Sequence, residues 1–229
     1  MPKIFVSPRI ATALFGATFL GLCAQPAQAV SALVTYGPNL VVNGNFERPE
    51  LSSTATPTAS IFPTSIQGWT GTNGIEIHKN IFTPIAEEGP QYAELDVSSN
   101  TSISQQISVS PGRTSRFSFY YSPRPGTSAL SNALDVSLSG NTIFSLSENG
   151  VGLGNTAWRS YSYDYTPSTS SVLIRFTATG DSDSLGVLVD GISYVQEVPG
   201  PLPVLGPLAI LGSFRRLRQL SSTMRLRRG

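Results

Sequence analysis

The chain has 229 residues and a formal net charge of +1. Its basic residues are concentrated at the two ends, because eight of the 15 Lys and Arg residues lie there, two before residue 30 and six after Glu197. All 14 acidic residues fall between these ends, so segment 30–198 has a net charge of −7, which argues against a nucleic-acid partner and is compatible with a hard cation. The one cysteine, Cys23, precedes that segment, which excludes disulfides, thiolate metal sites and cysteine nucleophiles from it.

Residues 1–29 have the three zones of a secretory signal peptide. Lys3 and Arg9 supply the positive charge, residues 10–22 form an apolar run, and small residues precede a cleavage site after Ala29. The apolar run of about a dozen residues is too short to cross a ~30 Å hydrocarbon core, so it is not a stable membrane anchor. The alternative is a buried helix of the domain, for which the later sequence offers no helical partner.

The segment after the signal peptide consists of short runs in which apolar and polar residues alternate, separated by Gly, Pro, Asn and Asp. This pattern predicts a single all-β domain, a β-sandwich or jelly roll, over residues 30–197. The Ser-, Thr-, Ala- and Pro-rich stretch 50–64 is expected to be a long surface loop. In chain order, the expected strands are 40–42, 74–78, 92–97, 102–109, 115–121, 134–138, 142–146, 158–165, 172–178 and 185–194.

The alternation also assigns faces within a strand. Phe117, Phe119 and Tyr121 fall on one side of their strand, and Tyr120 falls on the other. One side of each such strand is expected to pack against a second sheet.

Four short motifs, taken in order, carry a resemblance to a known superfamily. They are NLVVNGNFE at 39–47, QGW at 67–69, GIEI at 74–77 and VLVDGIS at 187–193. This ordered set resembles the galactose-binding-like jelly rolls, a superfamily that includes many carbohydrate-binding modules and the DUF642 domains. The resemblance implies a β-sandwich of the jelly-roll type and suggests sugar binding.

Two further motifs, EGPQYAELD at 88–96 and FYYSPRPG at 119–126, are similar to those of exported proteins of Gram-negative bacteria that end in a PEP-CTERM sorting signal. Residues 198–229 agree with such a signal, because a Pro/Gly motif is followed by an apolar run and an arginine cluster. The residues that carry the tail motif are Pro199, Gly200, Pro201, Arg215 and Arg216.

In that family an integral-membrane exosortase recognises the Pro-containing motif and removes the tail. Arginines on the cytoplasmic side would stall the apolar segment in the bilayer near the processing enzyme. The resemblance therefore implies transient inner-membrane contact and delivery to the cell surface or extracellular matrix. The alternative is a basic tail without a sorting role.

A calcium site is implied by the galactose-binding-like resemblance. In such modules a structural ion joins the Glu of the first motif, a neighbouring backbone carbonyl and the Asp of the last motif. By position these are Glu47, the carbonyl of Asn45, and Asp190, which would link the two ends of the domain. The alternative is that Asp190 caps a turn with Gly191 and that Glu47 pairs with Arg48.

Sugar binding requires aromatic faces for the apolar side of a pyranose and planar polar groups for its hydroxyls. Tyr120, Arg124 and Trp158 are the preferred candidates, since Tyr120 lies opposite the core face of its strand and Arg124 lies in a Pro-bounded loop. Trp69, Tyr161 and Tyr163 are further candidates, and a packing role is the alternative for each of the candidate residues. The predicted function is an exported, non-catalytic protein that binds cell-surface or extracellular polysaccharide; the rival is a structural envelope or biofilm matrix protein without a specific sugar.

A catalytic site is difficult to assemble from this sequence. His78 is the sole histidine, so a histidine-based zinc site or hydrolase triad would depend on it alone. Glu76, Glu94 and Asp96 lie on neighbouring expected strands and could supply a carboxylate pair for glycoside cleavage. In an acidic sandwich such proximity is expected without any catalytic role, and the sequence predicts that the protein is not an enzyme.

Overall fold

The computed structural model describes residues 34–51, 57–82 and 87–198, which form thirteen β-strands in two antiparallel sheets. The described ranges contain no helix that is long and apolar enough to cross a membrane. The predicted signal peptide and sorting signal lie outside the described residues, so both stay predictions. The site residues concerned are Ala29, Pro199, Gly200, Pro201, Arg215 and Arg216.

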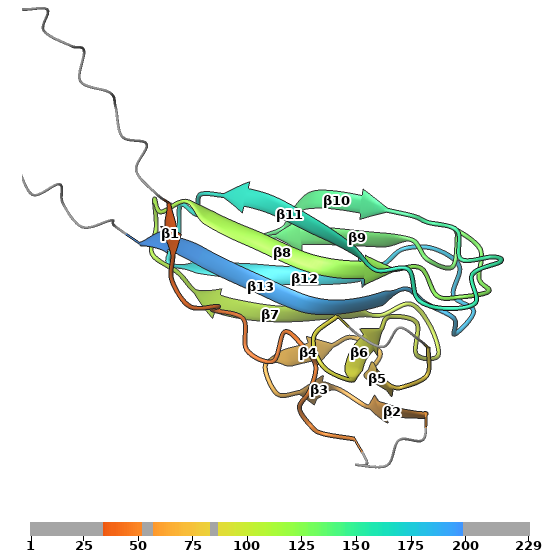
Figure 1. Cartoon of the computed structure of the whole chain (residues 1–229). Helices are drawn as coiled ribbons and strands as arrows, with labels where there is room; N and C mark the ends of the chain where they lie inside the picture. The colour runs from red at the N-terminus through yellow and green to blue at the C-terminus, as the bar shows by residue number, and fades with distance from the viewer. Residues whose placement is uncertain (1–33, 52–56, 83–86, 199–229) are drawn as a thin grey trace, which may run out of the picture. The chain divides into compact units, whose positions relative to one another are not determined.

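The first sheet has the strand order β11-β8-β13-β6-β5-β2, and β1 also pairs with β13 (Figure 1). Thr35 is the register partner of Val198, so the first and last described strands lie side by side. The strands of this sheet are β1 (Thr35–Tyr36), β2 (Thr58–Phe62), β5 (Ile75–Lys79), β6 (Gln91–Glu94), β8 (Ser115–Ser122), β11 (Arg159–Tyr165) and β13 (Leu188–Val198).

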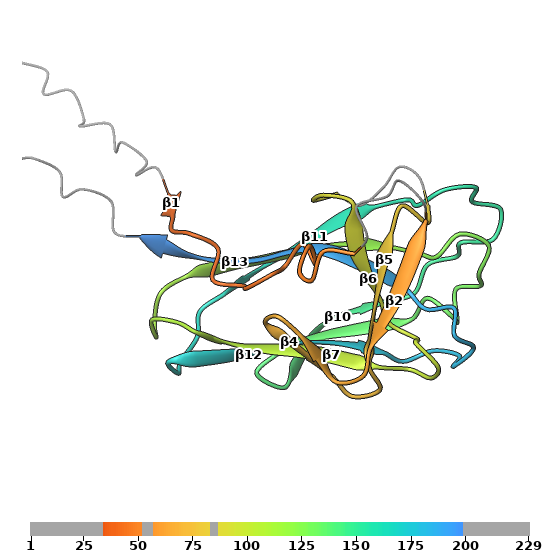
Figure 2. The same ribbon diagram turned by 90° about the horizontal axis from the view of Figure 1, so that it is seen from below.

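The second sheet has the order β10-β9-β12-β7-β4-β3. Figure 2 shows β13 and β11 in one layer and β12 and β7 in the other. The all-β sandwich predicted from the sequence is therefore confirmed. The strands of this sheet are β3 (Ser65–Ile66), β4 (Trp69–Gly71), β7 (Ser102–Ser108), β9 (Leu134–Leu138), β10 (Asn141–Leu146) and β12 (Ser171–Ala178).

The core lies between the two sheets and is rich in aromatic rings. Trp69 of β4 contacts Phe46 at a centroid distance of 5.7 Å and Phe176 of β12 at 6.2 Å. Phe176 also contacts Phe119 of β8 at 5.1 Å and Phe117 at 6.1 Å. Each of these side chains is almost fully buried, and burial of each apolar side chain contributes about 1.5–3 kcal/mol.

The predicted faces are confirmed in β8. Phe117, Phe119 and Tyr121 are fully buried in the core, whereas Tyr120 is partly exposed on the outer face of the first sheet. The strand alternates because successive side chains point to opposite faces. The outer face of this sheet is therefore the surface on which Tyr120 can contact a ligand.

Two expectations about the N-terminal part of the domain are wrong. Residues 58–62, expected to lie in a loop, form β2, which pairs with β5 at the edge of the first sheet. Residues 40–42, expected to form a strand, run beside β13 without joining the sheet. The Asn39 Oδ1 atom accepts the N–H groups of Val41 at 3.0 Å and Tyr194 at 2.9 Å, so a side chain replaces part of the ladder there.

Candidate functional site

Polar side chains of β5 and β6 project from the outer face of the first sheet. Ala93 lies in the core, so Tyr92 and Glu94 project to the opposite side, where their register partners are His78 and Glu76. Tyr92 and Glu94 have no exposed surface, and His78 is only 1% exposed. The part of the outer face formed by β6 is therefore buried, and the solvent-accessible part of this face lies on other strands.

Tyr120 and Asp190 are register partners on β8 and β13. Gly191, the next residue, has a φ of 55° in the left-handed region, where glycine adopts the backbone conformation without strain. A Cβ atom at Gly191 would lie 2.6 Å from Tyr120 Cδ2, so any side chain there would displace the tyrosine ring. Gly191 thus permits the Tyr120 ring to lie against the backbone of β13.

Trp158 directly precedes β11 and is partly buried. Its ring meets Tyr92 edge-on at 5.6 Å, and Tyr92 meets His78 in the same way at 5.5 Å. Edge-to-face aromatic pairs are worth about 0.5–1.5 kcal/mol beyond the area that they bury. The orientation of Trp158 is therefore fixed by a row of rings that crosses the outer face toward β5.

Arg124 follows β8, and its guanidinium lies 3.5 Å from Glu94 Oε1 and 5.7 Å from the centroid of the Phe82 ring. Glu94 also accepts two backbone N–H groups, from Asp96 at 3.1 Å and from Gly186. Burial raises the pKa of Glu94 to about 7, although the Asp96 N–H and the Arg124 charge oppose this effect. These contacts fix the guanidinium while 19% of the Arg124 side chain stays exposed.

Tyr120, Arg124 and Trp158 therefore lie on the outer face of one sheet, where Arg124 contacts the buried Glu94 and Trp158 contacts the buried Tyr92. Tyr120 and Trp158 offer partly exposed rings, and Arg124 offers planar hydrogen-bond donors. Figure 1 places β8, β13 and β11 next to one another, as the register requires. A face of this composition can stack against a pyranose and hydrogen-bond its hydroxyls.

Two of the three residues of the predicted calcium site, Glu47 and Asp190, bond to the same short segment of chain. Asp190 is fully buried; its Oδ2 atom accepts the N–H of Glu88 at 2.9 Å, whereas its Oδ1 atom has no hydrogen-bond partner. The Oε1 atom of Glu47 accepts the N–H of Gln91 at 2.8 Å, and Asn45 lies two residues before Glu47. Glu47 and Asp190 thus bond to the two ends of segment 88–91.

The Asp190 carboxyl meets one requirement of a cation ligand. Burial raises the pKa of Asp190 to about 8, which favours the protonated carboxyl when no cation is bound. The unpartnered Oδ1 atom is the kind of buried polar group that a hard cation would satisfy. Within the described part of the chain there is no cluster of three or more His, Cys, Asp and Glu side chains that could hold a metal, and the predicted calcium site has only two carboxylates besides its backbone carbonyl.

The residues considered for catalysis are used in internal hydrogen bonds. His78 is paired with Glu76 at 3.0 Å, and burial lowers the pKa of His78. Asp96 is fully buried and accepts the N–H groups of Asp183 at 2.7 Å and Ser184 at 2.8 Å. Asp96 thus hydrogen-bonds the backbone at residues 183–184, before β13, while Glu94 forms an ion pair with Arg124.

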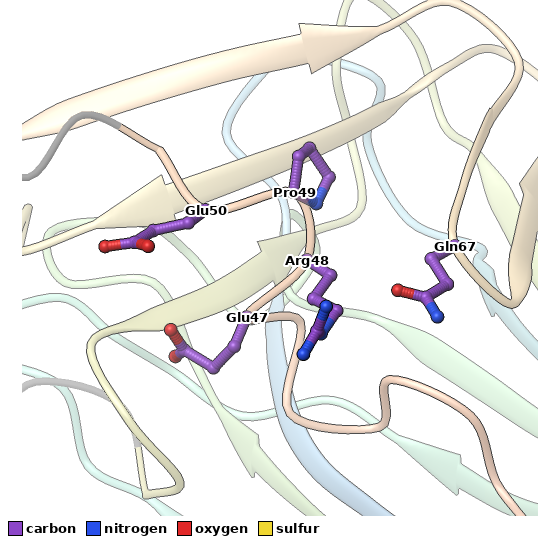
Figure 3. A pocket seen from close by; sticks show the side chains of 5 residues that line it. All are labelled: Glu47, Arg48, Pro49, Glu50 and Gln67. Atoms are coloured by element: carbon purple, nitrogen blue, oxygen red, sulfur yellow. The ribbon is translucent and has the colours of Figure 1, made fainter.

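A pocket of about 630 Å³, whose described lining includes none of the residues considered for catalysis, lies where the first two sequence motifs meet. In Figure 3 the side chain of Gln67 points toward Arg48, while the carboxylates of Glu47 and Glu50 extend on the other side. Pro49 completes the described lining. Sequence reasoning did not identify this pocket, although Glu47 and Gln67 stand in two of the motifs.

Residues 39–195 match the family model described as "Protein of unknown function (DUF642)". The chain belongs to the DUF642 family. The matched range contains every described residue predicted for sugar or calcium binding: Asn45, Glu47, Tyr120, Arg124, Trp158 and Asp190.

Two curated relatives are similar to most of this chain. Both are multifunctional-autoprocessing repeats-in-toxin proteins, and each is 29% identical to this chain. The Vibrio vulnificus protein aligns over 167 residues, 71% of this chain, and the Vibrio cholerae protein over 177 residues, 76% of this chain. The chain spans only about 3% of the length of these relatives.

Solved structures similar to the DUF642 domain include carbohydrate-binding modules. The module TmCBM61, solved with β-1,4-galactotriose, has 19% identity and a TM-score of 0.42, covering 70% of this chain and 100% of that one. The CBM22-1 xylan-binding domain of Paenibacillus barcinonensis has 16% identity and a TM-score of 0.39, covering 66% and 100%. A family 35 module of Clostridium thermocellum has 15% identity and a TM-score of 0.35, covering 62% and 99%. At these identities the likeness concerns the fold.

Proposed function

We propose that this DUF642 protein is an exported, non-catalytic surface or matrix protein that binds extracellular polysaccharide through the outer face of its first sheet. The observation that carries the proposal is the placement of Tyr120, Arg124 and Trp158 on that face. Aromatic rings bind the apolar face of a sugar, and a planar guanidinium binds its hydroxyls. Two of the three side chains rest on buried partners, Trp158 on Tyr92 and Arg124 on Glu94, so little side-chain entropy is lost on binding.

The first experiment is a glycan array probed with the purified protein. Saturable binding to at least one polysaccharide is expected, and Tyr120→Ala or Trp158→Ala should weaken it about tenfold or more, because each removes a stacking ring. Tyr163→Ala is the matched control, since Tyr163 is a 40% exposed tyrosine that packs at 6.3 Å against Phe144 at the sandwich edge. A blank array would instead favour a structural envelope or matrix protein without a specific sugar.

Calcium is proposed as the structural ion of this domain, held by the carbonyl of Asn45 and the side chains of Glu47 and Asp190. When bound, it would supply positive charge between the first and last parts of the domain and replace the proton on Asp190. We expect calcium to raise the melting temperature by several degrees, and Asp190→Asn to abolish the rise. Differential scanning calorimetry with calcium and with a chelator measures this, and equal melting temperatures in the two buffers would exclude the ion.

Export is proposed from the two ends of the chain. Cleavage after Ala29 by a signal peptidase and removal of the tail at Pro199-Gly200-Pro201 by an exosortase-type enzyme would leave a domain at the cell surface of a Gram-negative bacterium. We expect the mature protein in the surface or medium fraction, starting at Val30 and lacking Arg215 and Arg216. Mass spectrometry of both termini measures this. An intact C-terminus on the exported protein would exclude the processing step.

A further inference from the structure

The pocket at Glu47, Arg48, Pro49, Glu50 and Gln67 has a wall fixed by one side chain. Asn43 Oδ1 accepts the N–H of Arg48 at 3.0 Å, and Asn43 Nδ2 donates to the carbonyl of Arg48 at 2.7 Å and that of Gln67 at 3.2 Å. A single amide thus ties together two pocket residues that are 19 positions apart in sequence. Asn43 makes these bonds at a φ of 55°, a conformation that few non-glycine residues adopt.

Two buried polar side chains support the same wall from inside. Gln91 is fully buried, and its amide donates to the carbonyls of Phe46 at 2.6 Å and Pro49 at 3.1 Å and accepts the N–H of Leu51 at 2.7 Å. Lys79, 6% exposed, donates to the carbonyl of Leu51 at 3.0 Å. Burying such groups is costly unless they are hydrogen-bonded, and here their bonds fix the backbone of the pocket.

In contrast, the side chains of Arg48 and Gln67, which line the pocket, are available to hydrogen-bond a ligand. Within the described ranges, neither the guanidinium of Arg48 nor the amide of Gln67 makes a hydrogen bond or ion pair, although both residues are bonded through their backbones. Glu50 is 73% exposed and lies 3.9 Å from Lys79 Nζ. A rigid wall with free planar donors and acceptors is preorganised to bind a ligand through hydrogen bonds.

The described lining decides the ligand class. It contains donors, carboxylate acceptors and an amide that is both, which together match the hydroxyl groups of a sugar. It contains no aromatic ring, so it differs from the stacking surface on the sheet. Apart from Glu47, which is the proposed calcium ligand, the described lining carries one carboxylate and one guanidinium, and the net charge of −7 of segment 30–198 disfavours an acidic sugar. A volume of about 630 Å³ is within the usual range for small-ligand sites.

We propose that this pocket is a second binding site, specific for a short neutral oligosaccharide, in which Arg48 and Gln67 bind adjacent hydroxyls. The proposal goes beyond the polysaccharide site, because the pocket and the sheet face share none of their contacting side chains. The pocket proposal does not depend on whether Trp158 contacts a sugar.

The test is isothermal titration of the purified protein at fixed calcium concentration with neutral trisaccharides (galacto-, xylo-, cello- and maltotriose), with trigalacturonate as the acidic probe. At least one neutral trisaccharide should bind saturably. Arg48→Ala and Gln67→Ala should each weaken that binding by about tenfold, with unchanged melting temperature, since only exposed atoms are removed. Arg175→Ala is the matched control, because Arg175 is exposed on the other sheet.

Trp158→Ala separates the two sites. Loss of trisaccharide binding in Arg48→Ala and Gln67→Ala, with retention in Trp158→Ala, supports the pocket. If the Arg48 and Gln67 variants bind like the wild type, or if no neutral trisaccharide binds at millimolar concentration, the pocket is not a sugar site. Tighter binding of trigalacturonate than of every neutral probe would overturn the assignment of charge class.

Discussion

Replacing Trp69 with alanine should lower the free energy of unfolding by about 3–5 kcal/mol. Trp69 is 1% exposed, its ring packs against Phe46 and Phe176, and its indole Nε1 donates to the carbonyl of Asn43 at 3.0 Å. The substitution leaves a cavity between the sheets and removes the partner of a backbone carbonyl. Trp69 therefore links the core to the turn that carries the pocket wall.

Urea denaturation measures this effect, with Trp158→Ala as the control. Trp158 is partly buried on an outer face, so its removal should cost much less than that of Trp69. The pair also separates structure from binding, because Trp69→Ala should act on stability and Trp158→Ala on polysaccharide affinity. Equal losses of stability in the two variants would contradict the packing described for Trp69.

Gln91→Ala should lower the free energy of unfolding by about 3 kcal/mol or more. The substitution removes the partners of three backbone groups, the carbonyls of Phe46 and Pro49 and the N–H of Leu51, and each buried unsatisfied group costs about 1–3 kcal/mol. Because these groups form the pocket wall, the same variant should also weaken binding of the neutral trisaccharide.

Gln106→Ala is the matched control for Gln91→Ala, because Gln106 is an exposed glutamine on β7 of the second sheet. Its removal should change the free energy of unfolding by less than about 0.5 kcal/mol. Thermal and urea unfolding of both variants give the comparison. If Gln91→Ala is as stable as Gln106→Ala, the side chain does not hold the wall.

The strands β8, β9 and β12 could be predicted because buried and more exposed residues alternate along most of their length. The expected strand 134–138 has the same bounds as β9, and the expected faces of β8 are those observed. The strand β2 could not be predicted, because its Thr58, Ala59 and Ser60 resemble a loop in composition and its two larger apolar residues, Ile61 and Phe62, are adjacent rather than alternating. Composition alone therefore did not predict this strand, which forms by antiparallel pairing with β5.

The outer-face site could be predicted only in part. The placement of Tyr120 followed from period-two alternation against Phe119, a local property of the sequence. The partners that orient the site, such as Tyr92 beneath Trp158, are 66 positions away in sequence and meet it only through the strand order β6-β13-β8-β11. No local sequence pattern predicts this strand order.

The pocket could not be predicted at all. Arg48 and Gln67 converge because Asn43 hydrogen-bonds to both of their carbonyls, a long-range contact made by a side chain rather than by a strand ladder. The motif at 39–47 predicts a calcium ligand at Glu47, but nothing in its pattern indicates that Asn43 joins two segments of the chain.

The central claim, that polysaccharide binds on the outer face at Trp158, is tested most directly by a fluorescence titration. The chain has two tryptophans, of which Trp69 is buried in the core and Trp158 lies on the proposed face. A polysaccharide identified on the array should change the emission saturably in the wild type, and Trp158→Phe should remove the change while Trp69 still emits. An emission change that persists in Trp158→Phe would contradict binding at this face.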